Sequence, residues 1–404
     1  MTSSSAAASA PPLDGLTIVD LTRVLSGPYC TMLLADMGAR VIKVEQPGRG
    51  DDTRAWGPPF VGGESAYFLS INRNKESLTL DLKREAGRRV LETLLDRADV
   101  LVENFRPGTM ERLGFGYDVV SQRWPTLVYC SVSGFGQTGP RRHEPGYDAV
   151  IQAEGGLMSI TGDAEGPPFR LGVAIADIVS GMFAAQGIAM ALLARARTGR
   201  GQRVDIGMLD ATAALLTYQA SIYFATGTTP GRLGNRHPTI VPYETFAASD
   251  GDFVIAVGND EQWQRFCSAA GLGDLAADAR FATNQARVNG YRELRPLLAA
   301  RLRERSRAEW IRDLTAAGVP CGSVRTVAEV LGDEHLHARA MIEVLEHAAA
   351  GTVRVLGVPI KLSHTPGCVR TAPPILGQHT DDILTRDVGL TAAEIGALRA
   401  SGTV

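Results

Sequence analysis

The sequence predicts an α/β fold, in which a large domain built on a parallel sheet is joined to a smaller α+β domain. In the first half of the chain, short β-branched runs alternate with helical stretches, which is the order of βαβ units. The composition then shifts to Gly, Pro, Thr and Asn over residues 226–239, as is typical of a linker. The 404 residues are enough for two domains. We therefore predict a domain boundary near residue 226.

The elements of the large domain follow one another as strand, helix, strand. Residues 1–12 are rich in Ser, Ala and Pro and are predicted to be a disordered tail. A strand over residues 16–21 leads to a loop at 26–28, a helix that ends before Gly38, and a second strand over 40–45. Further strands are predicted over residues 77–82, 99–104, 126–132 and 204–206. Because helices separate these strands, we expect them to pair in parallel.

Several classes of function are disfavoured. The turn after the first strand lacks Gly-x-Gly-x-x-Gly, and the chain has no ATP phosphate loop. The net charge of −3 gives no general attraction for nucleic acid or an anionic membrane. The five cysteines are scattered, which predicts a reducing, cytoplasmic location without disulfides or a zinc site. His335 and His337 have no third ligand nearby in the sequence, so we expect no metal site.

The stretch over residues 171–193 is almost wholly apolar and carries one carboxylate, that of Asp177. We predict a buried core helix that starts near Asp177, and no transmembrane segment. Burying an unpaired carboxylate costs several kcal/mol, on the order of the penalty for isolated ions in protein interiors. One interpretation is that Asp177 is only the N-cap of this helix. The other is that it is a nucleophile in a dry pocket lined by small residues.

Polar and aromatic residues follow several of the predicted strands. Ligands in open α/β sheets bind beyond the carboxyl ends of strands. Gln46 follows the second strand, and Asn104, Phe105 and Arg106 follow the strand over residues 99–104. With the cations of Arg112 and Lys83, this set suits a nucleotide that carries phosphates. The alternative is that each is a solvated surface residue.

Several motifs in order resemble one family. They are Leu13-Asp14-Gly15, Val41-Ile42-Lys43-Val44-Glu45, Asn72-Arg73-Asn74-Lys75, Leu80-Asp81-Leu82-Lys83, Glu103-Asn104-Phe105-Arg106-Pro107-Gly108, Gly146-Tyr147-Asp148-Ala149, Ile175-Ala176-Asp177, Gly234-Asn235-Arg236-His237-Pro238 and Leu376-Gly377-Gln378-His379-Thr380. From about Leu13 onward the chain resembles the family III CoA-transferases, the group of formyl-CoA:oxalate and carnitine CoA-transferases, whose fold is shared by α-methylacyl-CoA racemases.

The resemblance implies an architecture. It implies a Rossmann-like CoA-binding domain over residues 13–225, a small domain over 226–325, and a return to the large domain over 326–404. It also implies a homodimer of two interlocked, ring-like protomers. Acyl-CoA and a carboxylic acid are then the substrates, and no tightly bound cofactor is expected.

The resemblance also implies roles for particular residues. Asp177 falls on the nucleophile, which forms an aspartyl anhydride and then an aspartyl-CoA thioester. The CoA contacts fall on Leu25, Ser26, Gln46, Leu80, Lys83, Asn104, Phe105, Arg106, Arg112 and Tyr147. The Gly-rich loop over residues 134–139 is a candidate source of oxyanion donors.

Departures from the family pattern point to the substrate. Leu25 stands where formyl-CoA transferases have Gln, Gln46 stands where they have Arg, and their Gly-rich segment in the small domain is missing. These differences argue against formyl-CoA and oxalate, and we expect succinyl-CoA with a dicarboxylic acid. One alternative is an α-methylacyl-CoA racemase, which would need a His at the position of Tyr147. A non-catalytic acyl-CoA-binding protein is a second alternative, and it would not need Asp177.

Overall fold

The computed structural model describes residues 10–404, which form two compact units. The first unit combines residues 10–157, 171–220 and 334–404, and the second combines 158–170 and 221–333. Residues 1–9 of the predicted tail lie outside the described residues. Pro11 accepts a hydrogen bond from the N–H of Asp14 at 3.0 Å.

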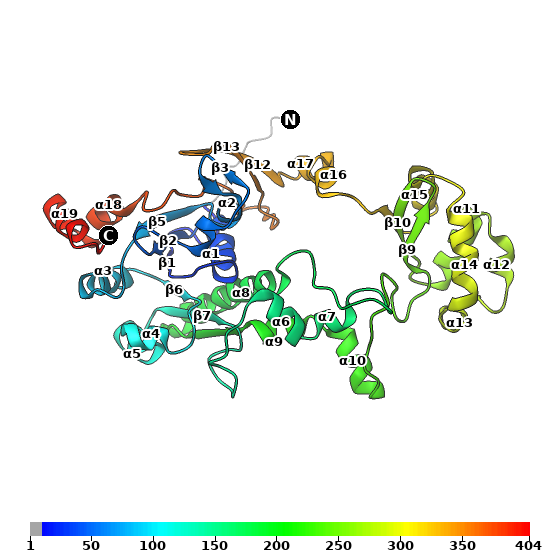
Figure 1. The fold of residues 1–404 in the computed structure, drawn as a ribbon, viewed down its shortest axis with the longest axis horizontal. Helices are drawn as coiled ribbons and strands as arrows, with labels where there is room; N and C mark the ends of the chain where they lie inside the picture. Colours follow the sequence, from blue (N-terminus) through cyan, green and yellow to red (C-terminus); the bar gives the residue numbers. More distant parts are fainter. Residues whose placement is uncertain (1–9) are drawn as a thin grey trace. The chain divides into compact units, whose positions relative to one another are not determined.

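A six-stranded parallel sheet organises the first unit, as predicted (Figure 1). Its strands are β1 (Thr17–Asp20), β2 (Arg40–Glu45), β5 (Lys75–Thr79), β6 (Val100–Glu103), β7 (Val128–Ser133) and β8 (Arg203–Gly207). The strand order is β5-β2-β1-β6-β7-β8, and every pair is parallel. The chain moves outward from β1 to β5 and then returns to place β6 on the other side of β1. Ligands in such sheets bind beyond the carboxyl ends of the two strands at this reversal, here β1 and β6.

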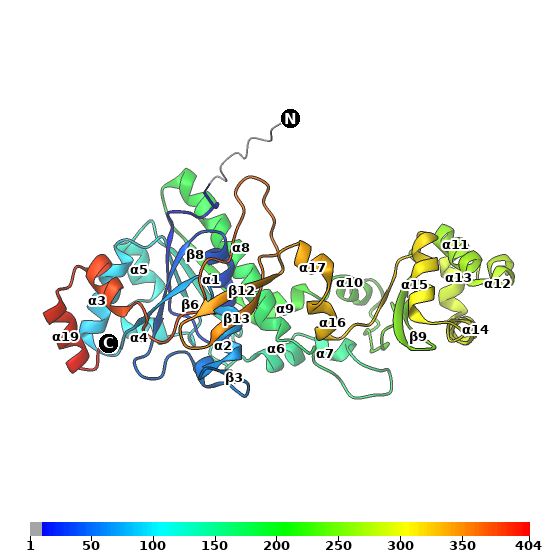
Figure 2. The same cartoon turned by 90° about the horizontal axis from the view of Figure 1, so that it is seen from above.

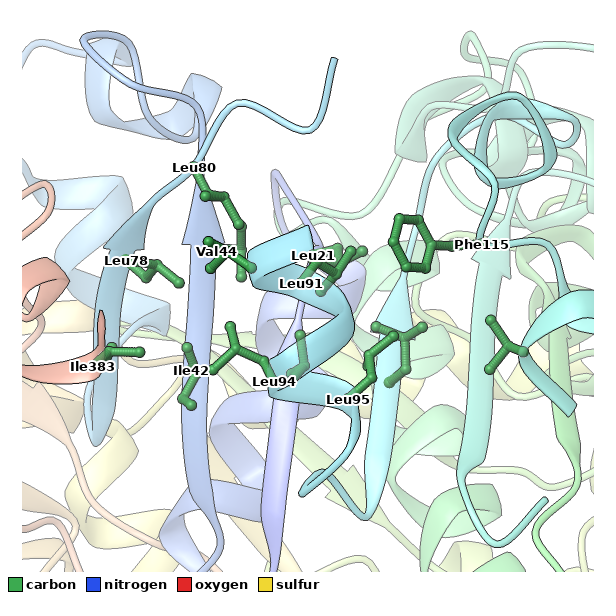
Figure 3. Packing of buried hydrophobic residues seen from close by; sticks show 14 of the residues in the cluster. Leu21, Ile42, Val44, Leu78, Leu80, Leu91, Leu94, Leu95, Phe115 and Ile383 are labelled. Atoms are coloured by element: carbon green, nitrogen blue, oxygen red, sulfur yellow. The ribbon is translucent and has the colours of Figure 1, made fainter. Parts of the chain in front are cut away.

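One face of the sheet packs against α3 (Glu85–Leu95), α4 (Thr109–Leu113), α5 (Tyr117–Arg123) and the C-terminal helices α18 (Thr380–Ile383) and α19 (Ala392–Ala400). Figure 3 shows Ile42 and Val44 of β2 facing Leu91 and Leu94 of α3. Figures 1 and 2 both show α19 beside α3. The end of the chain therefore completes the core of the first unit.

The opposite face packs against α1 (Ser26–Asp36), α6 (Asp148–Glu154), α8 (Ile175–Thr198) and α9 (Met208–Ala214). Alternate strand residues supply this second core, for example Ile18 of β1 and Val41 of β2. Strands buried on both faces explain the short, continuous apolar runs in the sequence. The loop predicted at residues 26–28 is instead the first turn of α1, because Pro28 is compatible with the start of a helix.

Helix α8 corresponds to the predicted core helix, but two expectations about it were wrong. It begins at Ile175, so Asp177 lies inside its first turn and Ala174 is the N-cap. Its outer face also exposes large apolar side chains, among them Met190 and Leu193. Among the described residues α8 is the one helix that is long and apolar enough to cross a membrane. Its inner face packs in the core of the first unit, as expected for the core helix of a globular domain.

The outer edge of the sheet is covered by the chain near its C-terminus. His379 donates its backbone N–H to the carbonyl of Ser77 in β5 at 3.0 Å. Thr380 Oγ1 accepts a hydrogen bond from the N–H of Thr79 at 3.1 Å. The hairpin of β12 (Ile342–His347) and β13 (Gly351–Leu356) belongs to the same unit. Covering an edge strand removes a template for unwanted strand pairing.

The second unit is α+β. An antiparallel sheet of β9 (Tyr243–Ala248), β10 (Gly251–Ala256) and β11 (Cys321–Ser323) packs with helices around fully buried Trp263 and Trp310. The helices of this core are α11 (Asp260–Ala270), α12 (Gly273–Ala277), α13 (Asn284–Asn289), α14 (Tyr291–Leu302) and α15 (Arg307–Ala316).

Shorter elements connect these parts of the chain. They are η1 (Asp52–Ala55), β3 (Phe60–Val61), β4 (Glu64–Ser65), α2 (Ala66–Ile71), α7 (Leu157–Ile160), α10 (Thr217–Thr226), α16 (Val327–Leu331), α17 (Glu334–Ala338) and η2 (Leu384–Val388).

Candidate active site

A pocket opens at the reversal point of the sheet, between the loops that follow β1 and β6. Its lining includes six of the predicted site residues, namely Ser26, Asn104, Phe105, Arg106, Tyr147 and Asp177. All of them belong to the first unit. The position of the pocket agrees with the general rule for ligand sites in open parallel sheets.

Asp177 is 9% exposed and lies in the first turn of α8. The capping role that the sequence suggested for it belongs to another residue. Asp148, at the start of α6, accepts a hydrogen bond from the N–H of Ala176 at 2.9 Å. This N–H is one of the orphan donors at a helix N-terminus, so Asp148 caps α8 from outside the helix. The carboxylate of Asp177 is therefore left to face the pocket.

The surroundings of Asp177 favour its protonated form. Burial and then the nearby charge of Asp148 raise the pKa of Asp177 to about 7, while hydrogen bonding from the hydroxyl and backbone N–H of Ser26 works in the opposite direction. The same two carboxylates affect the pKa of Tyr67. Burial, together with Asp177 and Asp148, raises the pKa of its phenol to about 12. A carboxylate with a pKa near neutrality in a pocket is a common feature of catalytic sites.

Close packing of α8 on α1 places Asp177 beside the N-terminus of α1. Gly181, one turn after Asp177, is the point of contact. A Cβ atom at Gly181 would lie 2.6 Å from the carbonyl oxygen of Ser26 and 3.1 Å from Cδ1 of Tyr29. The N–H groups of the first turn of α1 have no partners within the helix, and the helix dipole favours negative charge there. The site is therefore suited to a carboxylate and to an oxyanion that develops next to it.

The loop between β1 and α1 is clamped from both sides. The side chain of Asn104, after β6, accepts a hydrogen bond from Arg23 N–H at 2.8 Å and donates one to Arg23 C=O at 2.7 Å. The next residue, Val24, has a φ of 69°, which is unusual for a β-branched residue. Asp51 holds this conformation by accepting the N–H of Val24 at 3.1 Å. Strain of this kind persists only where its surroundings enforce it, and it is concentrated at functional sites.

A buried ion pair supports the clamp. Nζ of Lys43 lies 2.9 Å from Oδ2 of Asp51, and both side chains are fully buried. Although burial opposes the effect, the charge of Lys43 lowers the pKa of Asp51 to about 2. The carboxylate that holds Val24 therefore stays ionised at physiological pH.

A second pocket of the first unit contains most of the remaining predicted residues. Gln46, Leu80 and Lys83 line it, and Phe105 and Arg23 line both pockets. Arg49 adds a further cation, which pairs with Asp52 at 2.5 Å. The two pockets therefore adjoin, and the second one carries several cations that could bind phosphate groups.

Two predicted CoA contacts are not among the residues that line these two pockets. Leu25 is 7% exposed and packs in an apolar cluster with Met32 and Ile71. Arg112 donates a hydrogen bond to Oγ1 of Thr109 at 2.9 Å. Both lie near the pockets in the chain, but in this structure their side chains serve packing and local hydrogen bonding.

Three lining or supporting residues escaped the sequence prediction. β1 ends at Asp20, so Arg23 lies in the loop after β1 as Asn104 lies in the loop after β6, and that shared loop position could have identified it. Arg49 lies in a loop that shows no periodicity. Asp148 was visible beside Tyr147, but no local pattern links it to a helix that begins 27 residues later.

Comparison with known proteins identifies the family. The family described as CoA-transferase family III matches residues 13–380. The chain is 41% identical over 393 residues to the mouse succinyl-CoA:glutarate CoA-transferase, covering 97% of this chain and 90% of that protein. It is 44% identical over 364 residues to the acetyl-CoA:oxalate CoA-transferase of Acetobacter aceti, covering 90% and 92%.

A solved structure agrees. A CAIB/BAIF family protein from Brucella suis superposes with a TM-score of 0.84 at 42% identity, covering 94% of this chain and 100% of that one. The parallel-sheet architecture and the whole-chain sequence match thus lead to one conclusion: the chain belongs to CoA-transferase family III and is an enzyme of that type.

Proposed function

We propose that this enzyme transfers CoA from succinyl-CoA to a dicarboxylic acid, with Asp177 as the nucleophile. The observation that carries the proposal is the position of the buried Asp177 carboxylate, which faces a pocket beside the N-terminus of α1. The adjoining pocket with its cations supplies a place for the rest of the CoA molecule. A nucleophile for acyl transfer needs weak solvation and donors for the oxyanion, and both are present here.

The second pocket suits the nucleotide end of CoA. Arg49 and Lys83 are exposed cations on its wall, where they can meet phosphate groups. Phe105 offers an aromatic face, and the guanidinium carbon of Arg23 lies 5.3 Å from the centre of its ring. Because Arg23 and Phe105 line both pockets, the pantetheine arm could pass between them to reach Asp177.

The first half of the reaction loads CoA onto the enzyme. A carboxylate oxygen of Asp177 attacks the thioester carbon of the donor, the C–S bond breaks, and CoA leaves as a thiolate. The product is a mixed anhydride between Asp177 and the donor acyl group. The thiolate then attacks the aspartyl carbonyl and releases the donor acid as a carboxylate. The enzyme is left as an aspartyl-CoA thioester.

The second half reverses these steps with the acceptor. A carboxylate oxygen of the acceptor attacks the aspartyl thioester and displaces the CoA thiolate, which forms a second anhydride. The thiolate attacks the acceptor carbonyl, so acceptor-CoA leaves and the Asp177 carboxylate is regenerated. Each tetrahedral oxyanion needs fixed donors, and we assign the N–H of Ser26 and the loop at Gly134 as candidates.

The names of two relatives support the proposed class of donor and acceptor. The mouse relative is named for succinyl-CoA and glutarate, and the A. aceti relative is named for acetyl-CoA and oxalate. Both acceptors are dicarboxylic acids, in agreement with the dicarboxylic acid that we expect as acceptor; the departures at Leu25 and Gln46 favour the longer acid of the mouse relative over oxalate. The cations Arg23 and Arg106 line the pocket of Asp177 and could pair with the distal carboxylate.

A homodimer is part of the proposal. Helix α8 exposes a row of large apolar side chains on its outer face, Met182, Phe183, Met190 and Leu193. Exposed apolar surface of this kind is typical of protein–protein interfaces. A second copy of the chain, in the interlocked arrangement that the family resemblance implies, would cover it.

Chemical trapping of the intermediate tests the proposal. Incubation with succinyl-CoA followed by hydroxylamine should convert Asp177 into a hydroxamate, detected by peptide mass spectrometry. Asp177→Asn should give no adduct, whereas Glu144→Gln, which changes a carboxylate of the same pocket, should still be labelled. A label on another residue, or exchange of the α-hydrogen with deuterium from solvent and no transfer, would overturn it in favour of a different reaction.

A further inference from the structure

A separate pocket lies in the first unit between the end of β12 and the segment that covers the edge of β5. Its lining includes His347, Arg370, Gln378 and His379. None of these residues lines the pockets assigned above to the transfer reaction. The pocket is therefore distinct from the candidate active site.

His347, in the lining of this pocket, carries a buried donor. The residue is 5% exposed, and its Nδ1 accepts hydrogen bonds from the N–H groups of Ala349 at 3.1 Å and Ala350 at 3.0 Å. With Nδ1 acting as the acceptor, the ring proton is on Nε2. Within residues 10–404, Nε2 of His347 has no hydrogen-bond partner. A buried N–H without a partner is costly, so its presence points to an acceptor that occupies the pocket.

His379 repeats the arrangement on the opposite side. Its Nδ1 accepts the backbone N–H of Ser77 at 3.1 Å, which again assigns the proton to Nε2. Burial lowers the pKa of His379, so the ring is neutral at physiological pH. Both imidazoles thus carry N–H at Nε2 rather than a free lone pair. This tautomer excludes metal binding at these atoms and favours a ligand that accepts hydrogen bonds.

The remaining polar groups also favour an acceptor. Gln378 uses its Oε1 to accept the N–H of Ile375 at 3.0 Å, which leaves its amide group to donate. Arg370 brings a positive charge, and one of its guanidinium nitrogens donates to the carbonyl of Ala35 at 2.7 Å. Glu346 is the one acidic residue in the lining, but successive strand side chains point to opposite faces. Its carboxylate accepts a hydrogen bond from exposed Thr352 at 3.0 Å.

We propose that this pocket binds a small oxyanion, a carboxylate or a phosphate, whose oxygen accepts the Nε2–H of His347. The donors of His379 and Gln378 and the charge of Arg370 would complete the site. The bound anion would join the β12–β13 hairpin to the covered edge of β5. Its main effect would therefore be on stability, and the site does not depend on the transfer mechanism.

Two substitutions of His347 separate its two ring nitrogens. His347→Asn keeps an acceptor near the position of Nδ1 and removes the donor. His347→Gln places an amide N–H near the position of Nε2 and removes the turn acceptor. Thermal unfolding of the full chain is measured with sodium succinate, acetate or phosphate against sodium chloride at equal ionic strength. Anions that bind at the active site stabilise all variants alike, so only the difference between variants reports on this pocket.

We expect a binding anion to raise the Tm of the wild type by about 2 °C or more, and that of His347→Gln by a similar amount. His347→Asn should lose this increment. Protection by phosphate alone would identify a phosphate site, and protection by succinate or acetate a carboxylate site. Equal protection of His347→Asn and wild type, or none in either, overturns the proposal.

A measurement on the unmodified enzyme keeps the test decisive if a variant fails to fold. In protein labelled with ¹⁵N-histidine, the Nε2 resonance of His347 should shift on titration with the protective anion. The exposed His337 of α17, which lines none of the three pockets, serves as the internal reference. An unmoved His347 resonance at saturating anion also overturns the proposal.

Discussion

Asp148 caps the helix that carries Asp177, and the same carboxylate raises the pKa of Asp177. Oδ1 of Asp148 accepts the N–H of Ala176 at 2.9 Å, directly before Asp177 in the chain. After burial, the charge of Asp148 is the next cause of the raised pKa of Asp177. A single side chain therefore positions the proposed nucleophile and adjusts its protonation.

Asp148→Asn separates these two effects. The amide oxygen can still accept the N–H of Ala176, but the negative charge is gone, so the pKa of Asp177 should fall from about 7. Because the ionised form is the nucleophile, the acid limb of the pH profile of kcat/KM should move to lower pH by about one unit. Glu144→Gln is the control, since Glu144 lines the same pocket but pairs with Arg141 at 2.7 Å. An unmoved acid limb in Asp148→Asn would show that Asp148 does not control the nucleophile.

Asp177→Asn should abolish transfer and stabilise the fold above neutral pH. The folded-state pKa of about 7 lies above the unfolded value near 3.9, so the folded protein binds this proton more tightly. The contribution of Asp177 to the free energy of unfolding is therefore favourable at low pH and is lost as the pH rises from about 4 to 7.

The contribution of an asparagine at position 177 to the free energy of unfolding does not depend on pH. The free energy of unfolding of Asp177→Asn should therefore exceed that of the wild type by an amount that grows across this pH range, to at most about 4 kcal/mol. Urea unfolding of both proteins at pH 5 and pH 8 measures it. A difference that is the same at the two pH values would contradict the raised pKa.

Asn104→Ala should loosen the loop that leads into α1. Both hydrogen bonds to the backbone of Arg23 are lost, at a cost of about 1–3 kcal/mol in the free energy of unfolding. The same loop places Ser26 beside Asp177. We therefore expect Ser26 to shift and kcat/KM to fall by about 10–100-fold. Asn104→Asp keeps the acceptor for the Arg23 N–H but cannot donate, so its effect should be intermediate at high pH. Wild-type kinetics in Asn104→Ala would show that the two hydrogen bonds to Arg23 do not contribute to catalysis.

Gly181→Ala should separate α8 from α1. The added methyl group would lie 2.6 Å from the carbonyl of Ser26, so the helices must move apart. Overpacking of this kind costs about 1–3 kcal/mol, and the shift should reduce kcat by moving Asp177 away from Ser26. Gly396→Ala is the matched control because a Cβ at this position in α19 would meet nothing within 4 Å. It should stabilise the protein by about 0.5–1 kcal/mol and leave kcat unchanged. If both variants behave alike, contact at Gly181 does not position the site.

The order of strands and helices in the first unit could be predicted from the sequence. Runs such as residues 16–21 and 40–45 became β1 and β2 because their β-branched residues fill the two cores on either face of the sheet. Asp177 could also be singled out, since a lone carboxylate in an apolar run is costly whatever the fold around it. The strand runs and the lone carboxylate can be recognised from neighbouring residues in the sequence, because each depends on whether its own segment is buried.

The partners of these residues were decided only by the tertiary structure. The cap on α8 came from Asp148 rather than from Asp177, and Asn104 met Arg23 across the sheet reversal, 81 residues away. A free N–H at a helix or loop donates to whichever acceptor side chain the fold brings to it, and the sequence around it does not record that choice. Apolar periodicity therefore predicted the layers of this protein, whereas the geometry of its candidate site depends on long-range hydrogen bonds between backbone and side chains.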